Sequence, residues 1–317
     1  MDDERRETFG AALEQPEQLF AAGGAVGYET RPLLLFYAVS QAGRAIMAMS
    51  SRADWKTSGH GTGATQLDGF VREVEMRNQN KGLFISVADE IGSSSLVEAA
   101  RLADLLASIP EVSPTVPRIA AGSPALLLRR QRYRGQEFWG GPEVESTGIS
   151  FSDGWVFGLR TGFVGLPPDT EYQAVAELLR NYPTMEGWSI PGETIQVGFN
   201  GSDIGFRLAW DAAGMTGPDR QQRIRQIWGV EVDDVDGWVL PSLGANEIPM
   251  RPLATWWAAL HALSMLARYE PAAWARALDI DASDAAASIE TALDVGMVRM
   301  PELIRDELVR YGVAGGP

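Results

Sequence analysis

The chain contains only two histidines, His60 and His261, among its 317 residues. His60 lies in a glycine-rich loop that also carries Arg52 and Lys56. An imidazole titrates near physiological pH, so it can accept or donate a proton while basic neighbours hold an anion. Glycines let backbone amides approach such an anion closely. The loop therefore predicts acid–base chemistry on a phosphodiester, with His60, Arg52 and Lys56 as candidate catalytic residues, or the binding of a small anion.

The pair Arg52 and His60 resembles the arginine-to-histidine motif of HEPN-type ribonucleases, which also lies at a helix end. The resemblance implies a metal-independent ribonuclease. Seven residues separate the two positions here, a longer spacing than that motif usually has. In the structural alternative, His60 braces a turn between two helices and the glycines serve the shape of the backbone.

A second candidate site lies on an expected C-terminal helix. Polar and aromatic residues recur there at spacings of four, three and four, which places them on one side of a helix. These residues are Trp257, His261, Ser264 and Arg268. We expect Trp257, His261 and Arg268 to line a ligand-binding cleft. The alternative is a buried, hydrogen-bonded histidine and an ion pair between Arg268 and a glutamate at the helix end.

A run of arginines forms a third candidate site. If residues 126–134 form a strand, Arg130, Arg132 and Arg134 point to one face. Three guanidinium groups on one face would bind phosphate or carboxylate groups. A second basic island follows at 220–225. Such islands would contact RNA or an acidic partner, or they would only keep an edge strand from aggregating.

The residue types also narrow the chemistry. The chain has no cysteine, which excludes disulfides and thiolate metal sites, and two histidines disfavour a histidine-based zinc or iron site. Phosphate-loop, dinucleotide-binding and His-Glu-x-x-His motifs are absent from the sequence. We therefore expect no metal and no cofactor, although a carboxylate-bound Mg²⁺ stays open.

Charge and hydropathy bear on partners and location. A net charge of −15 disfavours general binding to nucleic acid, so RNA contact would need the local basic islands. Residues 1–7 show no signal-peptide pattern, and the apolar stretch 33–49 is interrupted by polar residues. We expect a cytoplasmic protein without membrane association.

The elements that must position these residues change character along the chain. Apolar residues at helical spacing predict a core helix over 31–50, with Thr30 as its cap and Pro32 in its first turn. Before it we expect a short helix interrupted by Pro16. After it we expect a polar helix over 67–78, a strand over 83–87 and a helix over 95–109.

The middle of the chain alternates in hydropathy and predicts β-hairpins. Asp153-Gly154 and Asn200-Gly201 are turn pairs flanked by alternating apolar residues, and Asp236-Gly237 is a weaker third candidate. Helices are expected over 171–181 and 218–228 within this region. The C-terminal part predicts helices over 253–270, 272–278, 283–293 and 301–311.

These patterns predict an α+β fold, with helical N- and C-terminal parts packed around a β-hairpin-rich central region. We expect a single composite domain over 1–317. Within it, 1–115 would be mainly helical with one strand, 116–250 β-rich with two helices, and 251–317 helical.

Four landmarks occur in order along most of the chain. They are Arg-Pro-Leu-Leu-Leu-Phe-Tyr at 31–37 followed by Gln-Ala-Gly-Arg-Ala at 41–45, Gly-His-Gly at 59–61, Ile-Pro-Glu at 109–111, and Leu-Ser-Met-Leu-Ala-Arg-Tyr-Glu-Pro at 263–271 with Trp274. With these landmarks the chain resembles the YaaC-like protein family. The resemblance implies no particular activity, because a fold alone does not determine a function.

Three functions remain open from the sequence. The leading hypothesis is a non-enzymatic interaction or regulatory protein that works with a protein partner, in a stress or phage-defence module, and that can form homo-oligomers. The second is a ribonuclease that uses His60 with Arg52 or Lys56. The third is a sensor of a nucleotide-like anion that Arg130, Arg132 and His60 would hold.

Overall fold

The computed structural model describes most of the two ends of the chain and parts of its middle. The described residues are 2–68, 71–116, 123–129, 149–150, 179–186, 195–197, 204–208, 219, 222, 226, 229–231, 236–244 and 248–314. Contacts between Cα atoms divide the chain into two compact units. The first unit combines 1–122 with 243–317, and the second unit is 123–242.

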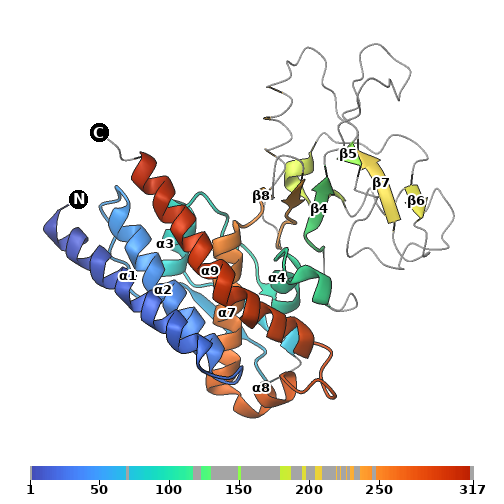
Figure 1. Cartoon of the computed structure of the whole chain (residues 1–317), viewed down its shortest axis with the longest axis horizontal. Coiled ribbons are helices and arrows are strands. Elements are labelled where there is room, and N and C mark those ends of the chain that lie inside the picture. The colour runs from blue at the N-terminus through green and yellow to red at the C-terminus, as the bar shows by residue number, and fades with distance from the viewer. Residues whose placement is uncertain are drawn as a thin grey trace. The chain divides into compact units, whose positions relative to one another are not determined.

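The first unit is mainly helical and draws its elements from both ends of the chain (Figure 1). Its elements in chain order are α1 (Asp3–Gly24), α2 (Arg31–Met49), β1 (Thr62–Thr65), β2 (Glu75–Asn78), α3 (Leu83–Glu90), β3 (Ala100–Arg101), α4 (Leu102–Ala107), α7 (Pro252–Tyr269), α8 (Pro271–Ala277) and α9 (Ala286–Ala314), with 3₁₀ turns at Val71–Glu73 and Ser113–Thr115.

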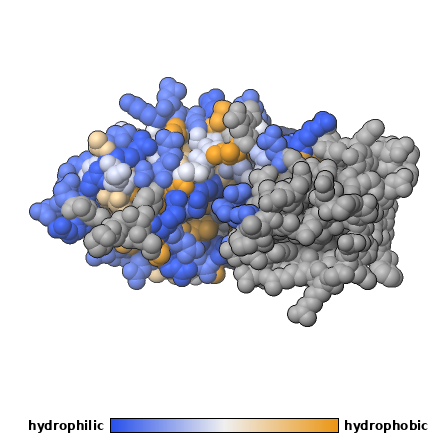
Figure 2. Space-filling model, turned by 90° about the horizontal axis from the view of Figure 1, so that it is seen from above, coloured by the Kyte–Doolittle hydropathy of each residue, from blue (hydrophilic) through white to orange (hydrophobic). Residues whose placement is uncertain are grey.

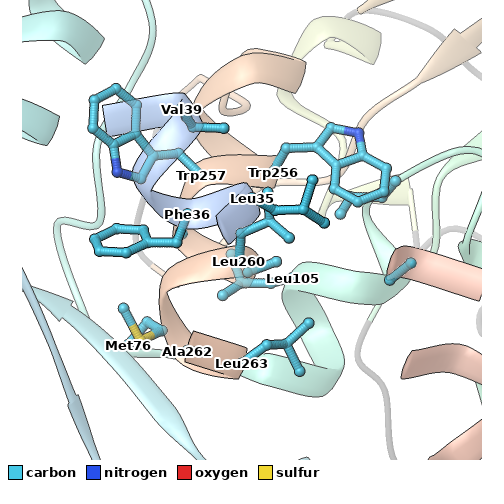
Figure 3. Packing of buried hydrophobic residues seen from close by; sticks show 14 of the residues in the cluster. Leu35, Phe36, Val39, Met76, Leu105, Trp256, Trp257, Leu260, Ala262 and Leu263 are labelled. Carbon is cyan, nitrogen blue, oxygen red and sulfur yellow. The ribbon is translucent and has the colours of Figure 1, made fainter. Parts of the chain in front are cut away.

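Helices α2 and α7 form the centre of this unit. Both begin with a proline in the first turn, where the missing N–H costs nothing, and both carry apolar residues on almost every side. Trp256 and Trp257 of α7 are each 1% exposed. The indole of Trp257 fits against Gly43 of α2, where an added Cβ would lie 2.3 Å from the ring. Figure 3 shows the cluster of buried apolar residues around these helices, with Phe36 of α2 and Trp257 on one side and Trp256 on the other.

Two helices run through a proline at which the sequence predicted an interruption. α1 continues through Pro16, and α9 is one helix through Pro301 rather than the two helices expected over 283–293 and 301–311. A proline inside a helix costs about 3 kcal/mol because one hydrogen bond is lost. Buried residues on both sides of each proline, such as Phe20 after Pro16 and Ile304 after Pro301, offset that cost.

The segment 67–109 differs most from the expectations. Residues 83–87 form the start of helix α3 instead of a strand, because a short apolar run suits either structure. The expected helix over 67–78 contains strand β2, which pairs antiparallel with β1 and β3. The expected helix over 95–109 is shortened to α4, because Ala100–Arg101 pairs with β2. The described residues of the N-terminal part therefore form three short strands, none of them at the predicted place.

The second unit contains short antiparallel strands. They are β4 (Leu126–Arg129), β5 (Ile149–Ser150), β6 (Ile195–Val197), β7 (Ile204–Leu208), β8 (Val230–Glu231) and β9 (Asp236–Val239), in the orders β4-β9-β8 and β5-β7-β6. The pairing of β6 with β7 confirms the hairpin strands predicted around Asn200-Gly201, whereas that turn lies outside the described residues. Asp236-Gly237 is not a turn, because both residues pair within strand β9.

Some expectations fall outside the description. The Asp153-Gly154 turn with its second strand, and most of the helices expected over 171–181 and 218–228, belong to the undescribed residues. The α+β class with helical N- and C-terminal parts is confirmed. The single composite domain stays a prediction. Among the described residues, α2 is long and apolar enough to cross a membrane, but 67% of that stretch is buried inside the protein, as in a core helix.

Candidate functional site

His60 is held at the surface by a tightly packed backbone crossing. The carbonyl groups of Gly59 and His60 accept hydrogen bonds from the N–H groups of Leu83 and Phe84, at 3.1 and 2.9 Å, and so satisfy the first amides of α3. Gly61 and Gly82 touch backbone to backbone, and a Cβ on Gly82 would lie 2.3 Å from Gly61. The glycines of the loop therefore serve backbone shape, as the structural alternative predicted, and the result is a fixed position for His60.

The two histidines meet although 200 residues lie between them in the sequence. Their ring centroids are 5.6 Å apart. Phe36 of α2 joins both rings, because it stacks on His261 at 4.3 Å with an interplanar angle of 5° and lies 5.2 Å from His60. We call His60, His261 and Phe36 the histidine cluster.

The two histidines have different surroundings. His261 is 2% exposed, and its Nδ1 is joined to the Thr62 hydroxyl by a hydrogen bond of 2.6 Å. His60 is exposed. The hydrogen bond occupies one ring nitrogen of His261 and fixes the orientation of its ring.

Arg268 brings a positive charge and two aromatic rings to the histidine cluster. Its Nη1 donates a hydrogen bond of 3.1 Å to the Tyr37 hydroxyl. Its guanidinium carbon lies 5.8 Å from the ring centroid of Tyr37 and 5.2 Å from that of Tyr269. The residues Tyr37 and Tyr269 are 38% and 59% exposed. We call Tyr37, Arg268 and Tyr269 the tyrosine–arginine platform.

The pKa values of both histidines are lowered. The surrounding protein partly desolvates the His60 ring and so lowers the pKa of His60, and the charges of Arg268 and Arg44 lower it further. Burial, followed by the charges of His60 and Arg268, lowers the pKa of His261 to about 3. Both rings are therefore neutral at neutral pH. Because it is exposed, His60 is the histidine that can accept a proton from a ligand.

Arg52 and Lys56, the predicted basic partners of His60, are engaged elsewhere. Arg52 forms ion pairs with Asp54 and Asp89, at 3.1 and 3.4 Å, and its pKa is raised mainly by the hydrogen bond with Asp54. Lys56 pairs with Glu4 of α1. The cations whose charges reach His60 are instead Arg44 and Arg268.

The second predicted set is partly assembled. His261 and Arg268 belong to this site, whereas Trp257 is buried in the core and its indole N–H has no hydrogen-bond partner among the described residues. The Ser264 hydroxyl donates to the His261 carbonyl at 2.9 Å. Among the described residues, Arg268 forms no ion pair with a glutamate, so the expected pair at the helix end is replaced by the bond to Tyr37.

Sequence reasoning missed Phe36, Tyr37, Thr62 and Arg44 as residues of the site. Phe36 and Thr62 carry no local signal, because an apolar helix residue and a strand threonine are common everywhere. Arg44 does carry one, since it is the only charged residue between 32 and 49, where each other residue is suited to a core helix.

The third predicted set lies outside the description. Arg130, Arg132 and Arg134 belong to the undescribed residues, as do most of the positions of the second basic island. No group of three or more His, Asp or Glu side chains able to hold a metal ion is found within the described part of the chain.

A pocket of about 310 Å³ lies beside the His60 loop. Residues from α1, α2, the loop and the start of α3 line it. These residues are Thr8, Arg44, Trp55, Lys56, Thr57, Ser58 and Leu83. Arg44 is the link between this pocket and the histidine cluster, because its charge also reaches His60.

Three of the four landmarks of the sequence coincide with the elements that build this site: α2, the loop before β1, and α7. No curated protein and no solved structure matches the chain. The model of one protein family, described as YaaC-like Protein, matches residues 2–308, which is nearly the whole sequence. The chain belongs to the YaaC-like family.

Proposed function

We propose that the protein is a metal-independent acid–base enzyme that cleaves a phosphodiester of RNA, with His60 as the general base. The observation that supports this proposal is the meeting of the only two histidines in one cluster, beside two arginines whose charges reach His60. Two arginines and an exposed neutral imidazole are suited to a phosphate group and to the proton transfer beside it.

Each group has a defined part in the reaction. His60 accepts the proton of a ribose 2′-hydroxyl, the oxygen attacks phosphorus, and the bond from phosphorus to the 5′-oxygen breaks. The products are a 2′,3′-cyclic phosphate and a 5′-hydroxyl, which takes its proton from water or from the imidazolium. Arg268 and Arg44 stabilise the charge that develops on the phosphoryl oxygens. His261 is a positioning residue, since its low pKa of about 3 keeps it neutral.

The tyrosine–arginine platform supports single-stranded RNA as the substrate class. Exposed aromatic rings stack on unpaired bases, each stack contributing about 1–3 kcal/mol, and arginine adds a cation–π contribution. Tyr37 and Tyr269 are the exposed rings that flank Arg268. The net charge of −15 restricts the contact to this local patch.

The test is cleavage of a mixture of single-stranded RNAs in EDTA. The wild-type protein is expected to produce fragments with cyclic phosphate ends, at a rate that rises with pH and reaches half its plateau below pH 6.5, because the pKa of His60 is lowered. His60→Gln should lose at least about 100-fold in rate, the usual contribution of a general base. Arg276→Gln, an exposed arginine on α8, is the control that should cleave normally. Absence of cleavage between about pH 5 and 8, where a histidine titrates, would contradict the proposal.

A second candidate is an interaction protein that binds a protein partner through the same platform. Tyrosine and arginine dominate the energetics of protein interfaces, and this platform exposes both residue types together. In this case Tyr269→Ala should abolish capture of the partner, whereas His60→Gln should leave it unchanged. A role in stress or phage defence, and the cytoplasmic location, stay predictions.

A further inference from the structure

The pocket beside the His60 loop has the charge and the hydrogen-bonding groups of an anion site. Its lining contains Arg44 and Lys56 but no acidic residue, in a chain whose net charge is −15. Three hydroxyl groups, from Thr8, Thr57 and Ser58, complete the polar part of the lining. Hydroxyl and guanidinium groups together are typical of sites that bind phosphate.

Two of these groups have unused hydrogen-bonding capacity. Lys56 already pairs with Glu4, but Arg44 forms no ion pair or hydrogen bond within the described part of the chain. The Thr57 hydroxyl is inaccessible to water and has no hydrogen-bond partner among the described residues. Because water does not reach this oxygen, a ligand in the pocket would bond to it only after the Thr57 side chain turns, whereas the Arg44 side chain is exposed.

The walls of the pocket are held in place by α1. Arg5 donates hydrogen bonds to the backbone carbonyls of Ser50 and Arg52, which fixes the start of the loop. The guanidinium carbon of Arg5 and the ammonium of Lys56 also lie 4.9 and 5.2 Å from the ring centroid of Trp55. Pockets that bind small molecules usually have volumes of about 300–1,000 Å³, so 310 Å³ suits a ligand at the small end of that range.

We propose that this pocket binds a small phosphate-bearing molecule, no larger than a mononucleotide, with the phosphate against Arg44. The site adjoins the proposed reaction centre and shares Arg44 with it, although His60 is not part of its lining. It has a consequence for that centre. Since the charge of Arg44 lowers the pKa of His60, a bound anion that offsets this charge raises the pKa of His60 again. Occupancy of the pocket would thus control how strongly His60 binds a proton.

Binding is tested by calorimetry on the full chain, with inorganic phosphate, pyrophosphate and AMP as probes and sulfate as the competing anion. At least one phosphate-bearing probe is expected to bind. Arg44→Gln should weaken its affinity at least tenfold, and Thr8→Val should weaken it measurably. Arg276→Gln is the matched control and should bind like the wild type. Equal binding by wild type and Arg44→Gln, or no binding of any probe, would overturn the proposal.

Proton NMR of the imidazole groups provides a second readout. The chain has only two histidines, and His261→Asn leaves the single resonance of His60. Saturating probe should move the midpoint of that resonance to higher pH, and Arg44→Gln should remove the movement. A midpoint that does not respond to a bound probe would show that the anion sits away from Arg44. His60→Gln should keep the binding while it loses RNA cleavage, so failure of this site and failure of the proposed enzyme are distinguishable.

Discussion

The loop that carries His60 and the helix α7 that carries His261 deliver two identical side chains to one place by different physical means. Backbone contacts position His60 in the loop. Glycines at positive φ allow Gly61 and Gly82 to touch, and main-chain hydrogen bonds join the loop to α3. Side-chain packing positions His261 in α7. The helix is surrounded by apolar residues, and Trp257 fills the space over Gly43.

The difference explains why one histidine is chemically available and the other is not. A histidine in a buried helix loses its hydration and stays neutral, whereas a histidine on a rigid surface loop keeps access to solvent and ligand. The packed region therefore positions His261, and the loop presents His60. Five measurements test this difference.

The largest effect is expected from Trp257→Ala in α7. Removal of a buried tryptophan side chain costs about 3–5 kcal/mol in the free energy of unfolding, because a large cavity is left. Denaturant titration measures this loss. Tyr269→Ala on the same helix is the control, and its cost should stay within about 0.5 kcal/mol because Tyr269 is 59% exposed. Equal costs for both variants would show that packing does not hold α7.

The next effect is expected from Gly82→Ala, at the backbone crossing. The new Cβ would lie 2.3 Å from the backbone of Gly61, and Gly82 has a φ of 148°, so strain and overlap together should cost on the order of 3 kcal/mol. Gly59→Ala in the same loop is the control, because its φ of 79° causes strain but no atom lies within 4 Å of its Cβ. A cost for Gly82→Ala no larger than that of the control would mean that the close approach is unimportant.

The third effect is a pH dependence that comes from His261. Its pKa is about 3 in the folded protein and near 6.5 when unfolded, so the unfolded chain binds the proton more tightly. The contribution of His261 to the free energy of unfolding is fully present above pH 6.5. It falls by about 1.4 kcal/mol for each pH unit between 6.5 and 3, which amounts to a loss of roughly 2 kcal/mol at pH 5. His261→Asn should show a shallower dependence over this range in denaturant titrations at several pH values. Parallel curves for the two proteins would exclude a buried neutral histidine.

The fourth effect concerns the hydrogen bond between Thr62, which follows the His60 loop, and His261 of α7. Thr62→Val removes the hydroxyl that is bonded to Nδ1 of His261 and should cost about 1–2 kcal/mol, because a buried nitrogen loses its partner. Thr65→Val, on the same strand, is the matched control and should be nearly neutral. If Thr62→Val were as stable as the control, the orientation of His261 would have to come from Phe36 alone.

The smallest effect on stability is expected from His60→Gln. The side chain is exposed and has no hydrogen bond among those described, so the free energy of unfolding should change by less than about 0.5 kcal/mol. The same variant carries the largest expected loss of RNA cleavage. A strongly destabilised His60→Gln would support a bracing role for this histidine instead of a chemical one.

Several parts of the fold were predictable because their signals are local. Apolar residues recur at helical spacing after Pro32 in the helix over 31–50, and the strands before and after Asn200-Gly201 alternate in hydropathy. The segment 83–87 was not predictable, because a five-residue apolar run fits a strand or a helix and only the carbonyls of Gly59 and His60 select the helix. The breaks expected at Pro16 and Pro301 were wrong for a related reason, because tertiary packing decides there as well. Packing on both sides of each proline outweighs one lost hydrogen bond.

The residues alone reveal which chemical groups are present: two histidines, no cysteine, an apolar helix with one internal arginine, and a glycine-rich loop around His60. Which of these groups lie together depends on the fold. It paired Arg52 and Lys56 with nearby acids and placed Arg44 and Arg268 near His60 instead. These partners come from segments far apart in the chain, so the packing of α2 against α7, not local spacing, sets the distances between them.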